Sequence, residues 1–202
     1  AWRLAGGAAR VLARLTGTPL RIAGRERLPQ GPCVVVSNHA SYLDGVIVVA
    51  ALPGPLAFVA KRELRSQFFA GLFLRRLGAA FVERFDVLRA VDDAARMADA
   101  VARGGSLAVF PEGTFVREPG MRPFHLGAFL AAARAGVPVV PVAIRGQRGI
   151  LPDGTWWPRH GALDVTVCEP IAPPRDAPDL FAAAVRLRDA AYRSIAAHAA
   201  GN

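Results

Sequence analysis

Residues 33–44 read Cys-Val-Val-Val-Ser-Asn-His-Ala-Ser-Tyr-Leu-Asp, an apolar run followed at once by polar side chains. The run Cys33–Ser37 is typical of a strand that is buried on both faces, as in a parallel sheet. The same arrangement returns later, where the apolar run 106–110 leads into Pro-Glu-Gly-Thr at 111–114. In open α/β sheets, ligands bind where the parallel strands end. The two stretches therefore predict a parallel sheet with a functional site at one edge.

Apolar runs alternate with segments of helical periodicity along the rest of the chain. Strands are expected at 20–23, 33–37, 56–60, 79–82, 107–110, 139–144 and 164–168, and helices at 1–15, 42–52, 62–77, 87–103, 125–135 and 178–199. This alternation predicts an α/β fold in which helices flank a mainly parallel central sheet. Pro141 stands inside one expected strand, and because proline has no N–H to donate, it indicates an edge or irregular strand.

The composition suits one folded domain with a helical extension at its start. The chain has 202 residues, of which 52% are hydrophobic and 20% charged, and this balance excludes a disordered chain. In segment 1–16, arginines are interspersed with apolar residues, which predicts a basic amphipathic helix. Such a helix lies in a membrane interface or packs its apolar stripe on the domain, and both alternatives stay open. We therefore divide the chain into this helix, over 1–16, and a single folded domain over 17–202.

The net charge of +9 favours an anionic partner, which is a nucleic acid, an anionic membrane surface or a phosphate-bearing substrate. The arginines are scattered and lack interleaved aromatics, so a nucleic-acid-binding module is not expected. No metal site is expected either, because the four histidines lie far apart and no Cys-x-x-Cys occurs. Cys33 and Cys168 stand in apolar runs and are expected to be reduced thiols. The sequence opens at Ala1 and not at methionine, so we expect a piece of a longer polypeptide.

His39 and Asp44 lie five positions apart across the expected strand-to-helix turn. In this arrangement the histidine can act as a general base and the aspartate can orient its ring. Ser41-x-x-Asp44 also fits a helix-capping pattern, which would explain both residues without catalysis. No serine or cysteine has the surroundings of an activated nucleophile. The simplest chemistry is therefore direct removal of a proton from a substrate hydroxyl by His39, as in acyl transfer to an alcohol.

Four ordered blocks of residues resemble the glycerolipid acyltransferases, and among them the 1-acylglycerol-3-phosphate acyltransferases. The blocks are Asn38-His39-x-Ser41-x-x-Asp44, Phe81-Val82-x-Arg84, Phe110-Pro111-Glu112-Gly113-Thr114 and Val137-Pro138-Val139-Val140-Pro141-Val142. The resemblance implies that His39 deprotonates the acceptor hydroxyl and that Asp44 orients it. The alkoxide then attacks the thioester of acyl-CoA or acyl-carrier protein, with no acyl-enzyme and no cofactor beyond that co-substrate.

The resemblance also implies roles for residues outside the His-Asp pair. Lys61, which is the only lysine, would stabilise the oxyanion, and Arg84 would bind the acceptor phosphate. Glu112, Gly113 and Thr114 would shape the acceptor site. From the residues alone, Lys61 is equally a solvated lysine at a helix start, Arg84 a surface arginine, and the third block a simple turn.

Two departures from the family pattern flank the presumed acceptor site. Many relatives continue the third block with Arg-Ser, whereas this chain has Phe115-Val116-Arg117, and His125 stands where a lysine is common. The acceptor headgroup is therefore less well determined than the reaction type.

The expected protein is thus an enzyme that acylates a lysophospholipid, most simply 1-acylglycerol-3-phosphate, at an anionic membrane surface. We expect it on the cytoplasmic face, either peripheral or anchored by segments outside this chain, since no apolar run here is long enough to span a bilayer. The alternative is a thioesterase or lipid hydrolase in which the same His-Asp pair activates water.

Overall fold

A computed structural model describes residues 2–61, 80–82, 87–114, 120–151, 157 and 159–199, without the side chains at 60–61, 80–82 and 87–93. The helix expected at 62–77 and the predicted site residue Arg84 lie outside the described residues.

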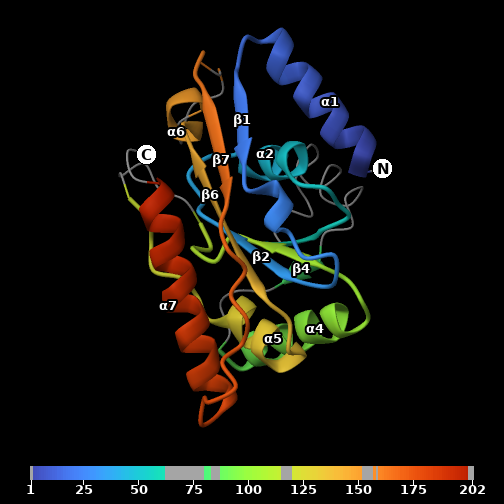
Figure 1. Ribbon diagram of the computed structural model, residues 1–202, viewed down its shortest axis with the longest axis vertical. Helices are drawn as coiled ribbons and strands as arrows, with labels where there is room; N and C mark the ends of the chain where they lie inside the picture. Colours follow the sequence, from blue (N-terminus) through green and yellow to red (C-terminus); the bar gives the residue numbers. More distant parts are fainter. Residues whose placement is uncertain are drawn as a thin grey trace.

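Seven strands form one sheet within the described part of the chain. They are β1 (Leu20–Ala23), β2 (Val34–Ser37), β3 (Ala57–Lys61), β4 (Ala80–Val82), β5 (Leu107–Val109), β6 (Val139–Arg145) and β7 (Leu163–Val167). Their order across the sheet is β1-β7-β6-β2-β5-β3-β4 (Figure 1). Every neighbouring pair is parallel except β6 with β7. The predicted α/β class with a mainly parallel sheet is confirmed.

The helices flank this sheet. They are α1 (Trp2–Leu15), α2 (Asp44–Ala51), α4 (Val87–Ala102), α5 (Gly127–Ala135), α6 (Gln147–Ile150) and α7 (Leu180–Ala199), with a short 3-10 turn η1 (Arg25–Arg27). The sequence predicted neither α6 nor η1, which are both too short to show a helical period. None of the helices described has both the length and the apolar content that crossing a bilayer requires.

Three helices begin two residues later than their apolar pattern predicted, namely α2, α5 and α7, which begins at Leu180. α2 begins at Asp44 and not at Tyr42, because the backbone N–H groups of Ala40 and Ser41 donate to the Asp44 carboxylate and close a turn there first. α5 begins after His125, whose backbone N–H donates to the carbonyl of Pro111. In α2 and α5, hydrogen bonds with the segments that follow β2 and β5 take the place of the first helical turn.

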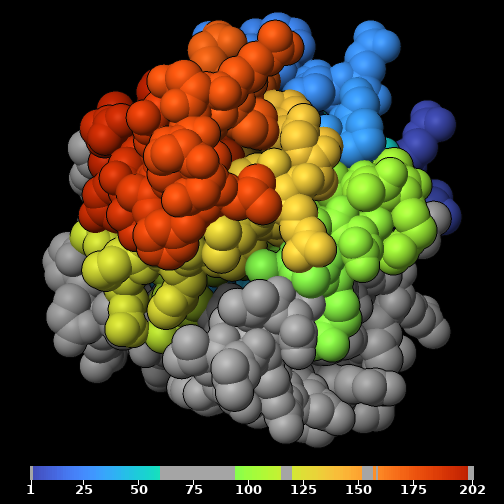
Figure 2. Space-filling model, turned by 90° about the horizontal axis from the view of Figure 1, so that it is seen from below, coloured from blue at the N-terminus to red at the C-terminus, as the bar shows by residue number. Residues whose placement is uncertain are grey.

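Two hydrophobic cores cover the two faces of the sheet. Val34 and Val36 of β2 belong to the core under α4, α5 and α7, whereas Val35 belongs to the core under α1 and α2. Figure 2 shows the described part of α4 in green, α5 in yellow and α7 in red on one side of the molecule, and α5 contacts both of the others. Burial on both faces explains why β2 reads as an unbroken apolar run.

Pro141 lies in the interior of the sheet, so the prediction of an edge strand is wrong. β6 pairs with β2 on one side and with β7 on the other. On the β7 side, however, the bridge Val139↔Ile171 and the ladder that starts at Val142↔Val167 differ in register by one residue. The missing N–H of Pro141 falls at this interruption, and an interior proline is tolerated there. The irregularity predicted as the other alternative is therefore present.

Candidate active site

Four parallel strands bring the predicted blocks to one edge of the sheet. β2 ends at Ser37, directly before 38–44, and its neighbour β5 ends directly before 110–114. β3 pairs with β5 and ends at Lys61, level with the end of β4. The backbone of three blocks and of Lys61 is thus gathered at the carboxyl ends of adjacent strands, where such sheets bind ligands.

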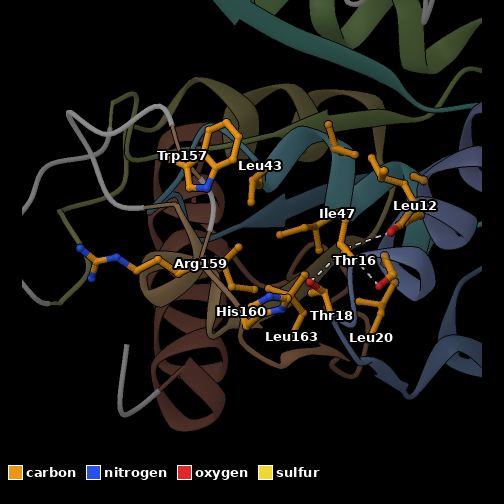
Figure 3. Close-up of a pocket in the computed structure, with 15 residues that line it drawn as sticks. Leu12, Thr16, Thr18, Leu20, Leu43, Ile47, Trp157, Arg159, His160 and Leu163 are labelled. Carbon is orange, nitrogen blue, oxygen red and sulfur yellow. Dashed lines mark hydrogen bonds between the residues drawn. The ribbon is translucent and has the colours of Figure 1, made fainter.

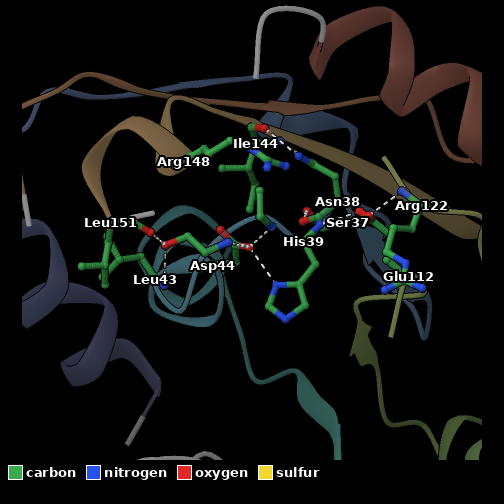
Figure 4. A network of polar contacts seen from close by, with 12 residues as sticks. Ser37, Asn38, His39, Leu43, Asp44, Glu112, Arg122, Ile144, Arg148 and Leu151 are labelled. Atoms are coloured by element: carbon green, nitrogen blue, oxygen red, sulfur yellow. Dashed lines mark hydrogen bonds and ion pairs between the residues drawn. The ribbon is translucent and has the colours of Figure 1, made fainter. Parts of the chain in front are cut away.

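His39 and Asp44 form the predicted hydrogen-bonded pair. His39 Nδ1 lies 2.8 Å from Asp44 Oδ2, and the Asp44 side chain is fully buried while that of His39 is 20% exposed. Oδ2 also accepts the backbone N–H groups of Ala40, at 2.7 Å, and Ser41, at 2.9 Å. Because Oδ2 also accepts two backbone N–H groups, the tautomer that fits this contact is the one in which His39 donates from Nδ1. Figure 4 shows Nε2 pointing away from this network, as a general base requires.

The capping alternative is found only in part: the N-cap of α2 is Leu43, without a side-chain cap hydrogen bond, whereas Ser41 and Asp44 bond the backbone of the turn before it. Ser41 Oγ accepts the backbone N–H of Leu43 at 3.2 Å, and Asp44 closes the turn onto Ser41. Ser41 Oγ donates to the carbonyl of Leu151 at 2.9 Å, and the residue has no exposed surface. Ser41 is therefore a structural residue of the turn that carries His39, and it is inaccessible as a nucleophile.

Asn38 locks the turn to the neighbouring strand, a role that the sequence did not reveal. Its Oδ1 accepts the N–H of Ile144 at 2.8 Å and its Nδ2 donates to the carbonyl of Ile144 at 2.9 Å. The side chain thus continues the β2–β6 ladder beyond its last backbone pair, Ser37↔Val142. Asn38 fixes the chain one residue before His39. Only the adjacency of Asn38 and His39 in the first block hinted at such a function.

Glu112 joins the third block to the first. Its Oε1 accepts the backbone N–H of His39 at 2.7 Å, and its Oε2 accepts that of Arg122 at 2.7 Å. Burial raises the pKa of the Glu112 carboxyl above its ordinary value of 4.5, although the N–H groups of Arg122 and His39 lower it in part. The sequence placed Glu112 beside the acceptor. That prediction stays untested, and among the described residues Glu112 holds the loop that carries His39.

The rest of the third block forms a tight turn. Gly113 has φ of 81°, a left-handed conformation that favours glycine, and its N–H donates to the carbonyl of Phe110 at 3.0 Å. Thr114 follows on the exposed side of this turn. The ring of Phe110 stacks on that of His39 with centroids 4.5 Å apart, a contact that no sequence pattern predicted. The third block therefore touches His39 twice, at its backbone and at its ring.

The cysteines have no part in this site. Cys33 and Cys168 are both free and buried, in agreement with the prediction of reduced thiols. Burial raises the pKa of the Cys33 thiol, although a hydrogen bond with Ser106 lowers it in part. Since the thiolate is the reactive form, Cys33 is a poor nucleophile.

An apolar cavity of about 350 Å³ opens between α1 and α2 (Figure 3). Leu43, which directly precedes Asp44, belongs to its wall. Other lining side chains come from both helices and from the segment that leads into β7, and include Leu12, Ile47, Ile150, Trp157 and Leu163. Leu43, the sequence neighbour of Asp44, thus belongs to the cavity wall, and the mainly apolar lining suits an apolar chain.

A comparison with protein families gives a profile described as Acyltransferase, which matches residues 19–145. The chain belongs to the acyltransferase family. A chloroplastic 1-acyl-sn-glycerol-3-phosphate acyltransferase of Brassica napus is 36% identical over 153 residues, which are 74% of this chain and 44% of the relative. A lyso-ornithine lipid O-acyltransferase of Pseudomonas aeruginosa is 35% identical over 144 residues, which are 70% of this chain and 54% of the relative. The resemblance to glycerolipid acyltransferases is confirmed.

The fold of this acyltransferase chain agrees with a solved structure. The 1-acyl-sn-glycerophosphate acyltransferase PlsC of Thermotoga maritima superposes with a TM-score of 0.80 at 24% identity, over 98% of this chain and 79% of that one. This likeness shows the fold. The chain spans about half the length of the curated relatives it matches.

Proposed function

We propose that this protein moves a fatty acyl group from acyl-CoA or acyl-carrier protein to the free hydroxyl of a lysophospholipid. The first candidate acceptor is 1-acylglycerol-3-phosphate. The proposal rests above all on one observation: the buried Asp44 carboxylate holds His39 by Nδ1, which directs the other ring nitrogen away from Asp44. Membership of the acyltransferase family supports the same reaction class.

In the proposed reaction, Nε2 of His39 takes the proton of the acceptor hydroxyl, and the hydroxyl oxygen bonds to the thioester carbonyl carbon. The tetrahedral intermediate then re-forms its carbonyl and breaks the C–S bond. The departing thiolate then takes from His39 the proton that came from the acceptor hydroxyl. Asp44 stabilises the imidazolium between these steps, as the aspartate does in a Ser-His-Asp triad. No acyl-enzyme is needed, and the burial of Ser41 and of both cysteines supports direct transfer.

We assign the oxyanion of the intermediate to Lys61 and the acceptor phosphate to Arg84. The position of the Lys61 backbone at the end of β3, beside β5, supports the first assignment. Glu112, Gly113 and Thr114 shape the acceptor site in this proposal, with Glu112 acting through the backbone of His39. One relative is named for a lyso-ornithine lipid acceptor, and that headgroup is the second candidate.

We further propose that the enzyme works on an anionic membrane, at its cytoplasmic face. The leucines Leu4, Leu12 and Leu15 of α1 are 79%, 59% and 81% exposed, and arginines lie among them. A basic amphipathic helix of this kind binds anionic interfaces, and the net charge of +9 adds to the attraction. Residues 1–16 are then a membrane-contact helix and 17–202 the acyltransferase domain. The cavity between α1 and α2 is assigned to an acyl chain.

The test is a product-resolved assay with one acyl-CoA and a panel of lysolipids. We expect CoA and the diacyl product in equal amounts with 1-acylglycerol-3-phosphate, and both to form at least about 100-fold more slowly with His39→Gln. Free fatty acid in place of the diacyl lipid would favour a thioesterase or hydrolase. Faster acylation of lyso-ornithine lipid would overturn the acceptor assignment and leave the reaction class intact.

A further inference from the structure

The hydrogen bond between His39 and Asp44 fixes one atom of the imidazole and leaves the plane of the ring undetermined. Nδ1 is held at 2.8 Å from Oδ2, and the ring can still turn about that contact. The side-chain torsion that sets the ring plane of histidine is intrinsically broad. The lone pair of Nε2 lies in the ring plane, so its direction is no better defined than the plane itself. Proton transfer needs that direction to be held.

Phe110 supplies a flat surface against the imidazole. The two ring centroids lie 4.5 Å apart and the planes differ by 20°, which is a stacked arrangement. We propose that Phe110 is a positioning residue that fixes the ring plane of His39 and thereby the direction of Nε2. The inference rests on the proposed role of His39 as general base. It adds to the third block a function distinct from acceptor binding.

Phe110 can act in this way because it is itself supported. Phe58 of β3 stacks behind it with centroids 6.4 Å apart, and Trp2 of α1 stacks behind Phe58 at 5.9 Å, both at 20°. Phe58 and Trp2 are buried, and the indole N–H of Trp2 donates to the carbonyl of Leu52 at 3.0 Å. Gly54 leaves the room for that indole, since a Cβ there would overlap its ring. The row of rings thus runs from α1 to the site.

The backbone of Phe110 is equally constrained. Its carbonyl accepts the N–H of Gly113, and Glu112 from the same turn holds the N–H of His39 at 2.7 Å. The turn therefore fixes the His39 backbone and the His39 ring relative to each other. A side chain without a flat face at position 110 would fill similar space and lose only the restraint on the ring plane.

The first test detects the contact without any substrate. An aromatic face at this distance shifts the ring protons of His39 upfield in the NMR spectrum. The chain has only four histidines, so His39→Gln identifies the signal. In Phe110→Leu we expect the His39 signal to move back toward the position of an unstacked histidine, and in Phe110→Tyr to stay shifted. An unchanged His39 signal in Phe110→Leu would overturn the proposal, whatever the activity of the enzyme.

The second test measures the consequence for turnover. We expect Phe110→Leu to lower kcat by about 10- to 100-fold, as for a small misplacement of a catalytic group, with both KM values within about twofold. Phe110→Tyr should recover most of kcat, because it keeps the flat face. Phe58→Leu, one ring further back, should cause a smaller loss.

Phe129→Leu is the matched control. Phe129 is a fully buried ring that stacks on Phe124 in the opposite core, so its loss lowers stability by a similar route. We expect its kcat to stay within about twofold of the wild type. Equal kcat losses in Phe110→Leu and Phe129→Leu, or no recovery in Phe110→Tyr, would contradict a positioning role. A wild-type protein without acyltransferase activity would instead contradict the proposed function, while the NMR result would still decide the contact.

Discussion

At the scale of single residues, the site depends on how Asp44 satisfies its buried charge. Oδ2 accepts the ring of His39 and the backbone N–H groups of Ala40 and Ser41. A buried carboxylate without such donors would be strongly disfavoured. The two backbone bonds therefore hold Oδ2 in place, and the third contact orients the ring of His39. In the proposed mechanism the same Asp44 oxygen orients His39 and closes the turn, so an informative substitution at Asp44 has to preserve the turn.

Asp44→Asn preserves the shape of the turn and removes the charge that stabilises the imidazolium. We expect kcat to fall by about 10²–10⁴-fold in this variant and in His39→Gln, the usual contribution of a general base. Thermal unfolding should verify that both variants fold. Ser41→Ala is the control for direct transfer: a buried turn residue should lower Tm and leave kcat within about threefold. Loss of all activity in Ser41→Ala would point to an acyl-enzyme.

Glu112 should leave a signature in the pH dependence of stability. Burial raises its folded-state pKa above the ordinary value of 4.5, so the folded protein keeps this proton at pH values where the unfolded chain has lost it. Its contribution to the free energy of unfolding is therefore greatest below pH 4.5 and falls as pH rises through the folded-state pKa. The difference in Tm between wild type and Glu112→Gln should decline over that window.

The exposed Glu26 provides the comparison for this measurement. Glu26→Gln removes an acidic group of the same kind at the surface of η1. The pH dependence of its Tm difference from the wild type is the baseline for the Glu112→Gln measurement. A Glu112→Gln difference that is flat, or that grows with rising pH, would show that hydrogen bonding outweighs burial at Glu112.

At the scale of secondary-structure elements, the sequence reveals what repeats locally and hides what joins distant segments. The strands β2 and β5 were predictable because burial on both faces demands an unbroken apolar run. The His39–Asp44 contact was predictable from spacing across one turn. The Asn38–Ile144 and Phe110–His39 contacts were not, because each joins residues far apart in the chain. Only the completed sheet brings these pairs together.

The cavity between α1 and α2 gives an element-scale prediction. Ala9 of α1 lines this cavity, and Ala9→Leu fills part of it without loss of helix propensity. We expect the variant to prefer shorter acyl chains than the wild type, measured as the ratio of kcat/KM values across a series of acyl-CoAs and lysolipids. Ala8→Leu adds the same volume on the exposed side of α1 and should leave the ratio unchanged. An equal change of this kcat/KM ratio in Ala9→Leu and Ala8→Leu would exclude the cavity as the acyl-chain site.

At the scale of the whole molecule, charge and apolar surface favour the same partner. The net charge of +9 attracts anionic surfaces at a distance, and the exposed leucines of α1 supply the contact that charge alone cannot. Trp2 anchors α1 to the core through Phe58 and Leu52, so the helix holds its exposed face in a fixed orientation. A membrane that binds α1 is therefore positioned relative to the cavity beneath it.

This arrangement predicts how the protein binds vesicles. Binding to vesicles that contain anionic lipids should weaken as salt is added, because screening removes the long-range attraction. Leu4→Ser combined with Leu15→Ser should weaken binding by at least about 10-fold, since burying a leucine contributes about 1.5–3 kcal/mol and 1.4 kcal/mol is tenfold in affinity.

The paired control, Leu180→Ser with Phe181→Ser, removes exposed apolar side chains from the start of α7. Because α7 packs on the opposite face of the sheet from α1, that control should bind vesicles like the wild type. Equal losses in the two double variants would show that general surface hydrophobicity drives binding, and the orientation set by α1 would then have to be abandoned.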